Sequence, residues 1–194
     1  MVTKEVIILV GGNGAGKSTF YERYLSKRQI PFLNADVYAA KRWPDAPEAH
    51  SYEAAKVIEQ ERNLHLNLGL SFCFETVFSH PSKVDFIAKA RAKGFNVHLI
   101  VIHIASEPEV NMARVADRKR RGGHGVPEDK VAARIPRTLA HIQLALDLCT
   151  SVSFYDNTLI SEPFSPQGVY ANGSFRPHPA CHQPKNWVNQ LLAR

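Results

Sequence analysis

The chain has 194 residues, of which 44% are hydrophobic and 22% charged, and these proportions are typical of one soluble globular domain rather than a disordered or fibrous chain. Its formal net charge of +6 suits an anionic ligand, and nucleic acid is not excluded. No apolar run approaches the roughly 20 residues of a membrane helix, and three scattered cysteines are too few for a disulfide framework. We therefore expect no membrane contact and a cytoplasmic location.

Segments typical of strands alternate with segments typical of helices along the chain. The pattern predicts strands at 5–10, 31–34, 71–74, 96–104 and 151–155. It predicts helices that begin at Lys17 and others at 47–69, 82–93, 108–120 and 127–148. Such alternation predicts an α/β fold, a three-layer sandwich with a mostly parallel five-stranded sheet. We expect a single domain over 1–194, with a hairpin that turns at Asn172-Gly173 and a last helix within about 160–194.

The first predicted strand runs directly into the sequence GGNGAGKST at residues 11–19. This run fits G-x-x-x-x-G-K-[ST], in which glycines let backbone N–H groups point at bound phosphates. Lys17 should reach the β- and γ-phosphates of ATP, and the Ser18 hydroxyl should hold Mg²⁺. The predicted nucleotide-binding residues are Gly12, Asn13, Gly14, Ala15, Gly16, Lys17, Ser18 and Thr19.

The phosphate loop alone does not distinguish a switch, a motor and a kinase. The chain lacks the N-K-x-D signature of GTPases and the L-S-G-G-Q signature of ABC-type ATPases. A helicase or motor would usually be longer. Transfer of the phosphate to an acceptor is therefore the best supported reaction.

Two acidic residues follow the predicted second and third strands. In a parallel sheet, ligands bind at the edge formed by the carboxyl ends of the strands. Asp36 is expected next to the phosphate loop as the carboxylate that accepts or orients the acceptor hydroxyl. Its alternative role is to cap the following helix. Glu75 is expected one strand further out, where it binds a substrate hydroxyl or a Mg²⁺-bound water. Thr76 and His80 are expected to bind substrate from the same loop.

Arginines flank the glycine-rich segment 122–125 on two predicted helices. They are Arg114, Arg118 and Arg121 before it and Arg134 and Arg137 after it. Because arginines stabilise the charge that develops in phosphoryl transfer, we predict a lid at about 114–137 that closes over ATP. Arg118 and Arg134 are the favoured γ-phosphate ligands, and a solvated basic helix pair is the alternative. The cluster His178, Cys181 and His182 lacks a second set of metal ligands and is interpreted as an ordinary tail segment.

The ordered motifs together resemble the zeta-toxin family of P-loop kinases, over roughly residues 5–160. They are GGNGAGKST, NAD at 34–36, FETVFS at 74–79, NMARVADRKRRGGHGVPED at 111–129 and YDN at 155–157. They are similar in particular to a short bacterial branch that is often labelled predicted ABC-type ATPase. The resemblance implies a kinase fold in which Lys17 and Ser18 bind ATP and Mg²⁺.

The resemblance also implies roles on the acceptor side. Asp36 would be the catalytic base and Glu75 an acidic residue beside the substrate, with lid arginines at Arg118 and Arg134. Zeta toxins phosphorylate a hydroxyl of UDP-N-acetylglucosamine and are held in check by a small antitoxin protein, so both are implied for this chain.

The favoured function is an ATP-dependent phosphotransferase that acts on a hydroxyl of a small phosphate-bearing metabolite. A kinase of nucleosides or of nucleic-acid ends is one alternative. An ATP-binding toxin–antitoxin or regulatory module, whose main role is to bind a partner, is the other.

Overall fold

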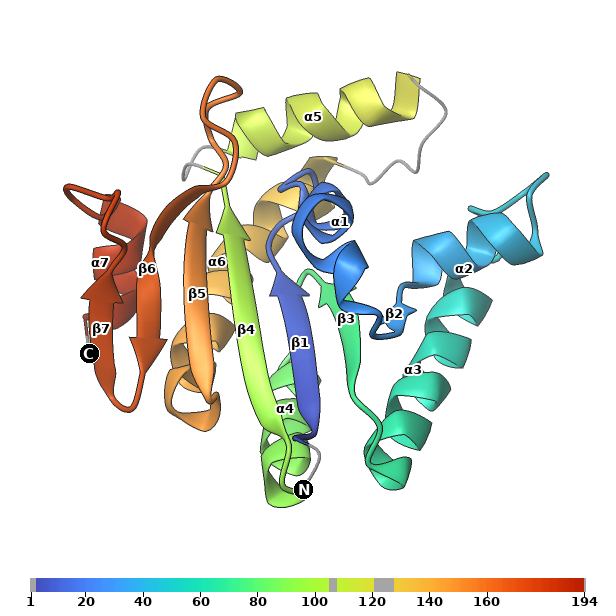
Figure 1. The fold of residues 1–194 in the computed structure, drawn as a ribbon. Coiled ribbons are helices and arrows are strands. Elements are labelled where there is room, and N and C mark those ends of the chain that lie inside the picture. Colours follow the sequence, from blue (N-terminus) through green and yellow to red (C-terminus); the bar gives the residue numbers. More distant parts are fainter. Residues whose placement is uncertain (1–2, 105–107, 121–127, 194) are drawn as a thin grey trace.

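The computed structural model describes residues 3–104, 108–120 and 128–193. Its centre is a seven-stranded sheet in the order β2-β3-β1-β4-β5-β6-β7 (Figure 1). The strands are β1 (Glu5–Val10), β2 (Phe32–Leu33), β3 (Phe72–Thr76), β4 (Asn96–His103), β5 (Ser151–Asp156), β6 (Ser165–Ala171) and β7 (Ser174–Pro177). The first five run parallel and the last two are antiparallel. The predicted α/β fold with a mostly parallel sheet is thus confirmed.

The sheet has seven strands rather than the predicted five because the C-terminal hairpin joins it. β6 pairs with β5, with Val152 opposite Tyr170, so the hairpin extends the sheet instead of standing apart from it. The turn at Asn172 and Gly173 agrees with the prediction, and both residues have positive φ angles of 51° and 74°. Such angles are required at both central residues of the tight turn that joins two twisted strands.

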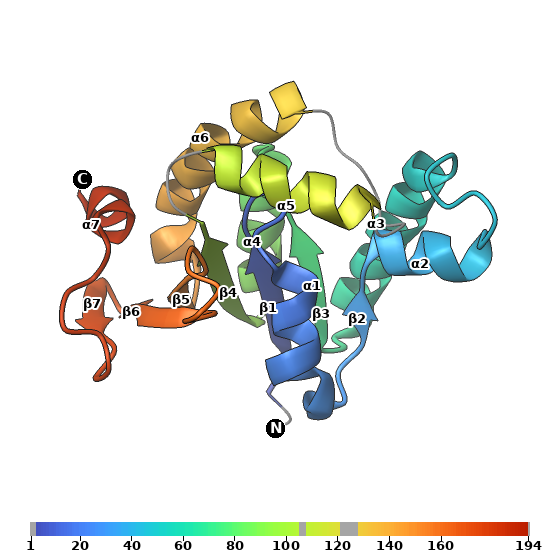
Figure 2. The same cartoon turned by 90° about the horizontal axis from the view of Figure 1, so that it is seen from above.

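Helices cover both faces of the sheet, as Figure 2 shows from above. They are α1 (Lys17–Phe20), α2 (Ala35–Arg42), α3 (Ser51–Leu68), α4 (Ser82–Ala92), α5 (Pro108–Arg120), α6 (Glu128–Ala145) and α7 (Asn186–Leu192). α1, with the short turns after it, packs on one face, and α4, α6 and α7 pack on the other. α5 crosses above the carboxyl ends of the central strands (Figure 1).

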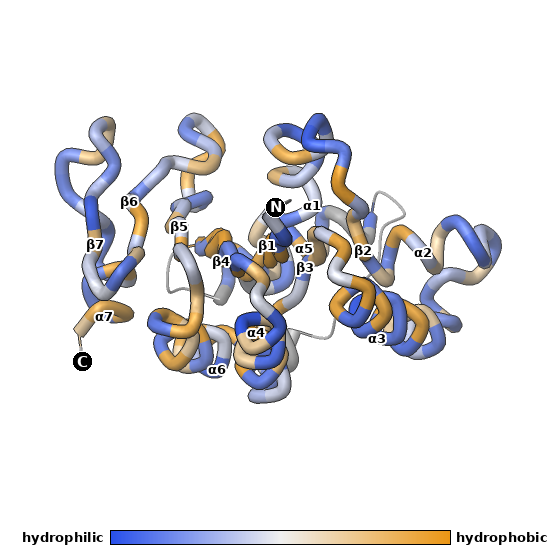
Figure 3. Tube along the Cα trace, turned by 60° about the horizontal axis from the view of Figure 1, so that its bottom comes forward, coloured by the Kyte–Doolittle hydropathy of each residue, from blue (hydrophilic) through white to orange (hydrophobic). Residues whose placement is uncertain are grey.

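β1 lies at the centre of the molecule and is buried on both faces. Val6, Ile8 and Val10 belong to the core under α4 and α6, whereas Ile7 and Leu9 belong to the core under α1. This division follows from the alternation of side chains along a strand. Figure 3 shows the hydrophobic residues gathered in the central strands, while α3, α4 and α6 alternate between hydrophobic and hydrophilic residues. No helix in the described parts of the chain has both the length and the apolar character needed to cross a membrane.

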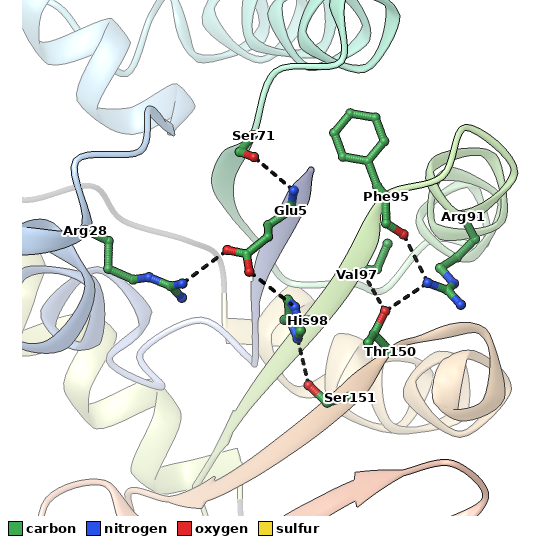
Figure 4. Close-up of polar contacts among 9 residues, drawn as sticks. All are labelled: Glu5, Arg28, Ser71, Arg91, Phe95, Val97, His98, Thr150 and Ser151. Atoms are coloured by element: carbon green, nitrogen blue, oxygen red, sulfur yellow. Dashed lines mark hydrogen bonds and ion pairs between the residues drawn. The ribbon is translucent and has the colours of Figure 1, made fainter. Parts of the chain in front are cut away.

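A polar network joins the amino ends of the central strands, at the end of the sheet opposite the glycine-rich loop (Figure 4). The Glu5 carboxylate accepts a hydrogen bond from Arg28 at 3.1 Å and lies 4.0 Å from Nε2 of His98. Nδ1 of His98 lies 2.8 Å from Oγ of Ser151. Burial lowers the pKa of His98, and the Glu5 carboxylate opposes this shift. The network therefore ties β1, β4 and β5 together away from the candidate site.

Candidate active site

The glycine-rich loop connects β1 to α1 and curves tightly over the carboxyl end of the sheet. Gly14 and Gly16 have φ angles of 78° and 93°, which disfavour residues with a side chain. A Cβ at Gly14 would also lie 2.8 Å from the carbonyl oxygen of Asn111, and one at Gly16 would lie 2.7 Å from Nδ2 of Asn157. The loop therefore needs glycine at both positions, for backbone conformation and for space.

Lys17 is almost fully buried at the start of α1, with a relative exposure of 9%. Its ammonium group donates hydrogen bonds to the carbonyl oxygens of Gly11 and Gly12, both at 3.1 Å. The charge thus lies inside the curve of the loop rather than in the solvent. A burial of this kind is costly for an ammonium group unless polar partners surround it.

Side chains from distant segments fix the shape of the loop. Nδ2 of Asn157 donates to the carbonyl oxygen of Ala15 at 2.9 Å, and Nδ2 of Asn111 donates to that of Asn13 at 2.8 Å. Arg134 donates to the side-chain oxygen of Asn13 at 3.3 Å. The sequence analysis gave neither asparagine a role of its own. A usable signal was that Asn157 follows β5 directly, at the same edge of the sheet as the loop.

Glu75 contacts the phosphate loop directly. Oγ of Ser18 donates a hydrogen bond to Oε2 of Glu75 at 2.8 Å. Glu75 lies on β3, which pairs with β1 so that Glu75 is opposite Leu9. The expectation that Asp36 lies next to the loop and Glu75 one strand further out is wrong, because β3 lies between β1 and β2.

Asp36 lies in the first turn of α2, a helix whose bounds were not predicted from the sequence. Oδ1 of Asn34 caps this helix by accepting from the backbone N–H groups of Asp36 at 2.8 Å and Val37 at 3.1 Å. The alternative role of Asp36 as the cap therefore belongs to Asn34. The carboxylate of Asp36 lines the cavity next to the loop.

An open cavity of about 840 Å³ brings most of the predicted site residues together. The residues predicted from the sequence that line it are Asn13, Gly14, Gly16, Lys17, Ser18, Thr19, Asp36, Glu75, Thr76, Arg114 and Arg134. His80 is not among the described lining residues. Its side chain is exposed, and Nδ1 accepts from the backbone N–H of Ser82 at 3.2 Å, where α4 begins.

The predicted lid is described only in part. Arg114 donates to the carbonyl oxygens of Asn157 and Thr158 at 2.8 and 3.1 Å, so it connects α5 to the segment after β5. Arg137 points along its own helix, where it donates to the carbonyl oxygen of Ala133. The side chain of Arg118, and the whole of Arg121 and of the segment 122–125, lie outside the described residues.

The C-terminal tail shows no sign of a metal site. No group of three or more potential ligands was found among the described residues. Nδ1 of His178 accepts from the backbone N–H of Ala180 at 3.1 Å, as in a local turn. Trp187 is buried and donates to Oδ2 of Asp156 at 3.0 Å, so it packs in the core.

A central parallel strand, followed by a glycine-rich loop with a buried lysine and then a helix, defines the class of P-loop proteins with a kinase-like fold. The chain belongs to a family described as an AAA domain, AAA_33, whose profile matches residues 6–144.

Other comparisons agree with this fold. A Haemophilus influenzae protein that is described as an uncharacterized protein is 29% identical over 134 residues, which cover 69% of this chain and 94% of the relative. The crystal structure of AvrRxo1-ORF1:-ORF2 with ATP matches 98% of this chain, with a TM-score of 0.71 and 14% identity. This chain spans only 64% of the length of that AvrRxo1 chain.

Two further structures are similar over most of this chain. One is from the PezAT chromosomal toxin–antitoxin system of Streptococcus pneumoniae, with a TM-score of 0.57 and 16% identity over 80% of this chain and 68% of the other. The second is from the Pnkp1/Rnl/Hen1 RNA repair complex, with a TM-score of 0.58 and 16% identity over 74% of this chain and 47% of the other. At these identities the likeness concerns the fold.

Proposed function

We propose that this protein is a kinase that transfers the γ-phosphoryl group of ATP to a hydroxyl group of a small molecule. The observation that carries the proposal is a shared cavity. The phosphate-loop residues Lys17 and Ser18 line the same space of about 840 Å³ as the carboxylates Asp36 and Glu75. Phosphoryl transfer needs this combination, because a donor phosphate and an acceptor hydroxyl must meet in line.

The loop residues fit a nucleoside triphosphate with Mg²⁺. Gly14 and Gly16 leave no room for a side chain, so the backbone N–H groups of the loop can approach phosphate oxygens closely. Lys17 would neutralise the β- and γ-phosphates, and Ser18 would hold Mg²⁺, which supplies further charge neutralisation when bound. Arg134, fixed near Asn13 at 3.3 Å, is the described lid arginine best placed to approach the γ-phosphate.

The two carboxylates would have separate roles. Glu75 accepts a hydrogen bond from the Ser18 hydroxyl at 2.8 Å, which leaves the lone pairs of Oγ available to a cation. Asp36 lies at the start of α2 on the acceptor side of the cavity and makes no contact of this kind with the loop among the described residues. It is therefore the proposed base, which orients the incoming hydroxyl and accepts its proton.

The acceptor in this proposal is a phosphate-bearing metabolite, with UDP-N-acetylglucosamine as the first to test. Support comes from the resemblance to zeta toxins and from the fold shared with a chain of the PezAT toxin–antitoxin system. A small antitoxin protein is the proposed partner, because AvrRxo1-ORF1 was also crystallised with a second protein. Phosphorylation of nucleic-acid ends is the second candidate, favoured by the fold shared with a chain of an RNA repair complex and by the net charge of +6.

The test compares wild type with Asp36→Asn, and uses Asp45→Asn as the matched control because Asp45 is exposed and is not among the lining residues. Each protein is incubated with labelled ATP and Mg²⁺ plus UDP-N-acetylglucosamine, a 5′-hydroxyl RNA oligonucleotide or a total metabolite extract. Transfer should fall by about 10²-fold or more in Asp36→Asn, the usual range for a positioned base. ATP affinity should not change.

The outcomes separate the candidates. Label on the sugar nucleotide supports the first acceptor, and label on the RNA supports the second candidate. Unchanged transfer in Asp36→Asn would remove Asp36 from the mechanism. If wild type labels nothing in any mixture, the proposal of a kinase is wrong.

A further inference from the structure

The part of the cavity wall that α3 and α4 contribute is rich in positive charge. One face of α3 lines this wall with residues three or four positions apart, including Lys56, Glu59 and Arg62. Lys83, from the first turn of α4, lines it as well. Among the described residues of this wall, three cations thus face one carboxylate.

Arg62 is fixed against aromatic rings. Its guanidinium carbon lies 4.8 Å from the ring centre of Phe74 and 6.0 Å from that of Phe86. Phe74 is buried on β3, so the ring that orients the guanidinium is itself fixed in the core. Stacking on rings orients a guanidinium group while its N–H donors remain available to a ligand.

The donors of both cations remain uncommitted in the described structure. Neither the guanidinium of Arg62 nor the ammonium of Lys83 donates a hydrogen bond to another described residue. This distinguishes them from Arg114 and Arg134, which donate to the protein itself. Half-buried cations whose N–H donors have no acceptor are costly, and an anionic ligand would remove that cost.

The electrostatics agree with this geometry. Burial lowers the pKa of Lys83, the charge of Arg62 lowers it further, and Glu59 opposes both effects. Burial also lowers the pKa of Arg62, and Glu59 again opposes the shift. The two cations therefore repel one another, and the exposed Glu59 offsets this repulsion only in part.

We propose that Arg62 and Lys83 form a subsite for a phosphate group of the acceptor, in the part of the cavity that α3 and α4 line. The inference rests on the proposed kinase function and names the residues that would hold the phosphate of a phosphate-bearing acceptor. A planar fork of donors beside a point charge matches the several oxygens of a phosphate group. The phosphate held there orients the acceptor, so that its hydroxyl reaches Asp36.

The test measures binding of inorganic phosphate by ³¹P NMR titration, with the phosphate loop first saturated by a non-hydrolysable ATP analogue and Mg²⁺. Lys83→Gln is compared with Lys89→Gln, a matched control on an exposed position of the same helix that is not among the lining residues. Phosphate affinity should fall by about 10-fold or more in Lys83→Gln, as expected for a lost charge-assisted hydrogen bond. It should not change in Lys89→Gln.

A second variant, Arg62→Gln, should weaken phosphate binding similarly, and the affinity for the ATP analogue should remain within about twofold of wild type in all three variants. Equal phosphate affinity in wild type and Lys83→Gln would overturn the subsite. The phosphate subsite would also be overturned if acetate displaced phosphate at the same concentration, because the site would then fit an acceptor with a carboxylate group. The subsite would also be overturned if an RNA oligonucleotide bound more weakly to Lys83→Gln than to wild type while inorganic phosphate bound equally to both proteins.

Failure of the subsite and failure of the kinase function give different results. If labelled ATP phosphorylates metabolites that carry no phosphate of their own, the subsite is wrong and the kinase function stands. If inorganic phosphate binds as expected but no metabolite is ever labelled, the kinase function is wrong and the anion site stands.

Discussion

Asn157 offers a sharp test of how the phosphate loop keeps its shape. Asn157→Ala removes two buried hydrogen bonds, from Nδ2 to the carbonyl oxygen of Ala15 at 2.9 Å and from the N–H of Phe164 to Oδ1 at 3.2 Å. Each deletion leaves one buried backbone group without a partner, at a cost of about 1–3 kcal/mol. Because water can enter the space left by the amide, we expect values at the lower end, or about 3 kcal/mol in total.

The assay is urea unfolding followed by tryptophan fluorescence, together with titration of ATP and Mg²⁺. Asn157→Ala should lower the free energy of unfolding by about 3 kcal/mol. It should also weaken ATP binding by about 10-fold, because the freed loop must be ordered when ATP binds. The control is Asn189→Ala, an exposed position on α7, which should stay within about 0.5 kcal/mol of wild type. If Asn157→Ala is as stable as this control, the loop does not depend on Asn157 for its shape.

Three other changes probe the site and the core. Lys17→Ala should abolish transfer in the labelled-ATP assay and weaken ATP binding, and activity within about threefold of wild type would contradict the assignment of the phosphate loop. Arg134→Ala should lower kcat by about 10³-fold with a much smaller change in ATP affinity, whereas an equal loss of both would make Arg134 a ground-state ligand. Burial lowers the pKa of His103 from 6.5 to about 4, with Asp156 opposing the shift. The unfolded chain therefore takes up this proton at higher pH than the folded protein. The stability that neutral His103 provides is complete above pH 6.5, and about 3 kcal/mol is lost as the pH falls towards 4. Urea titrations at several pH values should show this slope in wild type and a flatter one in His103→Gln, and equal slopes would refute it.

Local patterns predicted the centre of the fold. β1 has a continuous apolar run because it is buried on both faces, and the glycines after it are required by backbone angles at Gly14 and Gly16. Both features are properties of neighbouring residues, so the sequence displays them directly. The hairpin turn at Asn172 and Gly173 was predictable for the same reason.

The order of the strands was not predictable in this way. The local sequence at 31–34 and 71–74 does not indicate which of these two strands pairs with β1. The strand order depends on the crossover connections and on the packing of the helices. As a result, Asp36 was expected next to the phosphate loop, whereas the structure places Glu75 there, in contact with Ser18. α2 was also missed, since its eight residues are too few to show a helical period, although Asn34 is a favoured capping residue.

β5 and the C-terminal hairpin, which belong to the sheet, lie beyond the end of the family match. The family profile ends at residue 144, whereas β5 begins at Ser151 and pairs with β4 along six positions from His98 to His103. A fragment cut at the end of the family match would expose the long, apolar β4 as a sheet edge, a known hazard for aggregation. It would also lose Asn157 and with it one anchor of the phosphate loop. The family match therefore covers only part of the seven-stranded sheet that this chain forms.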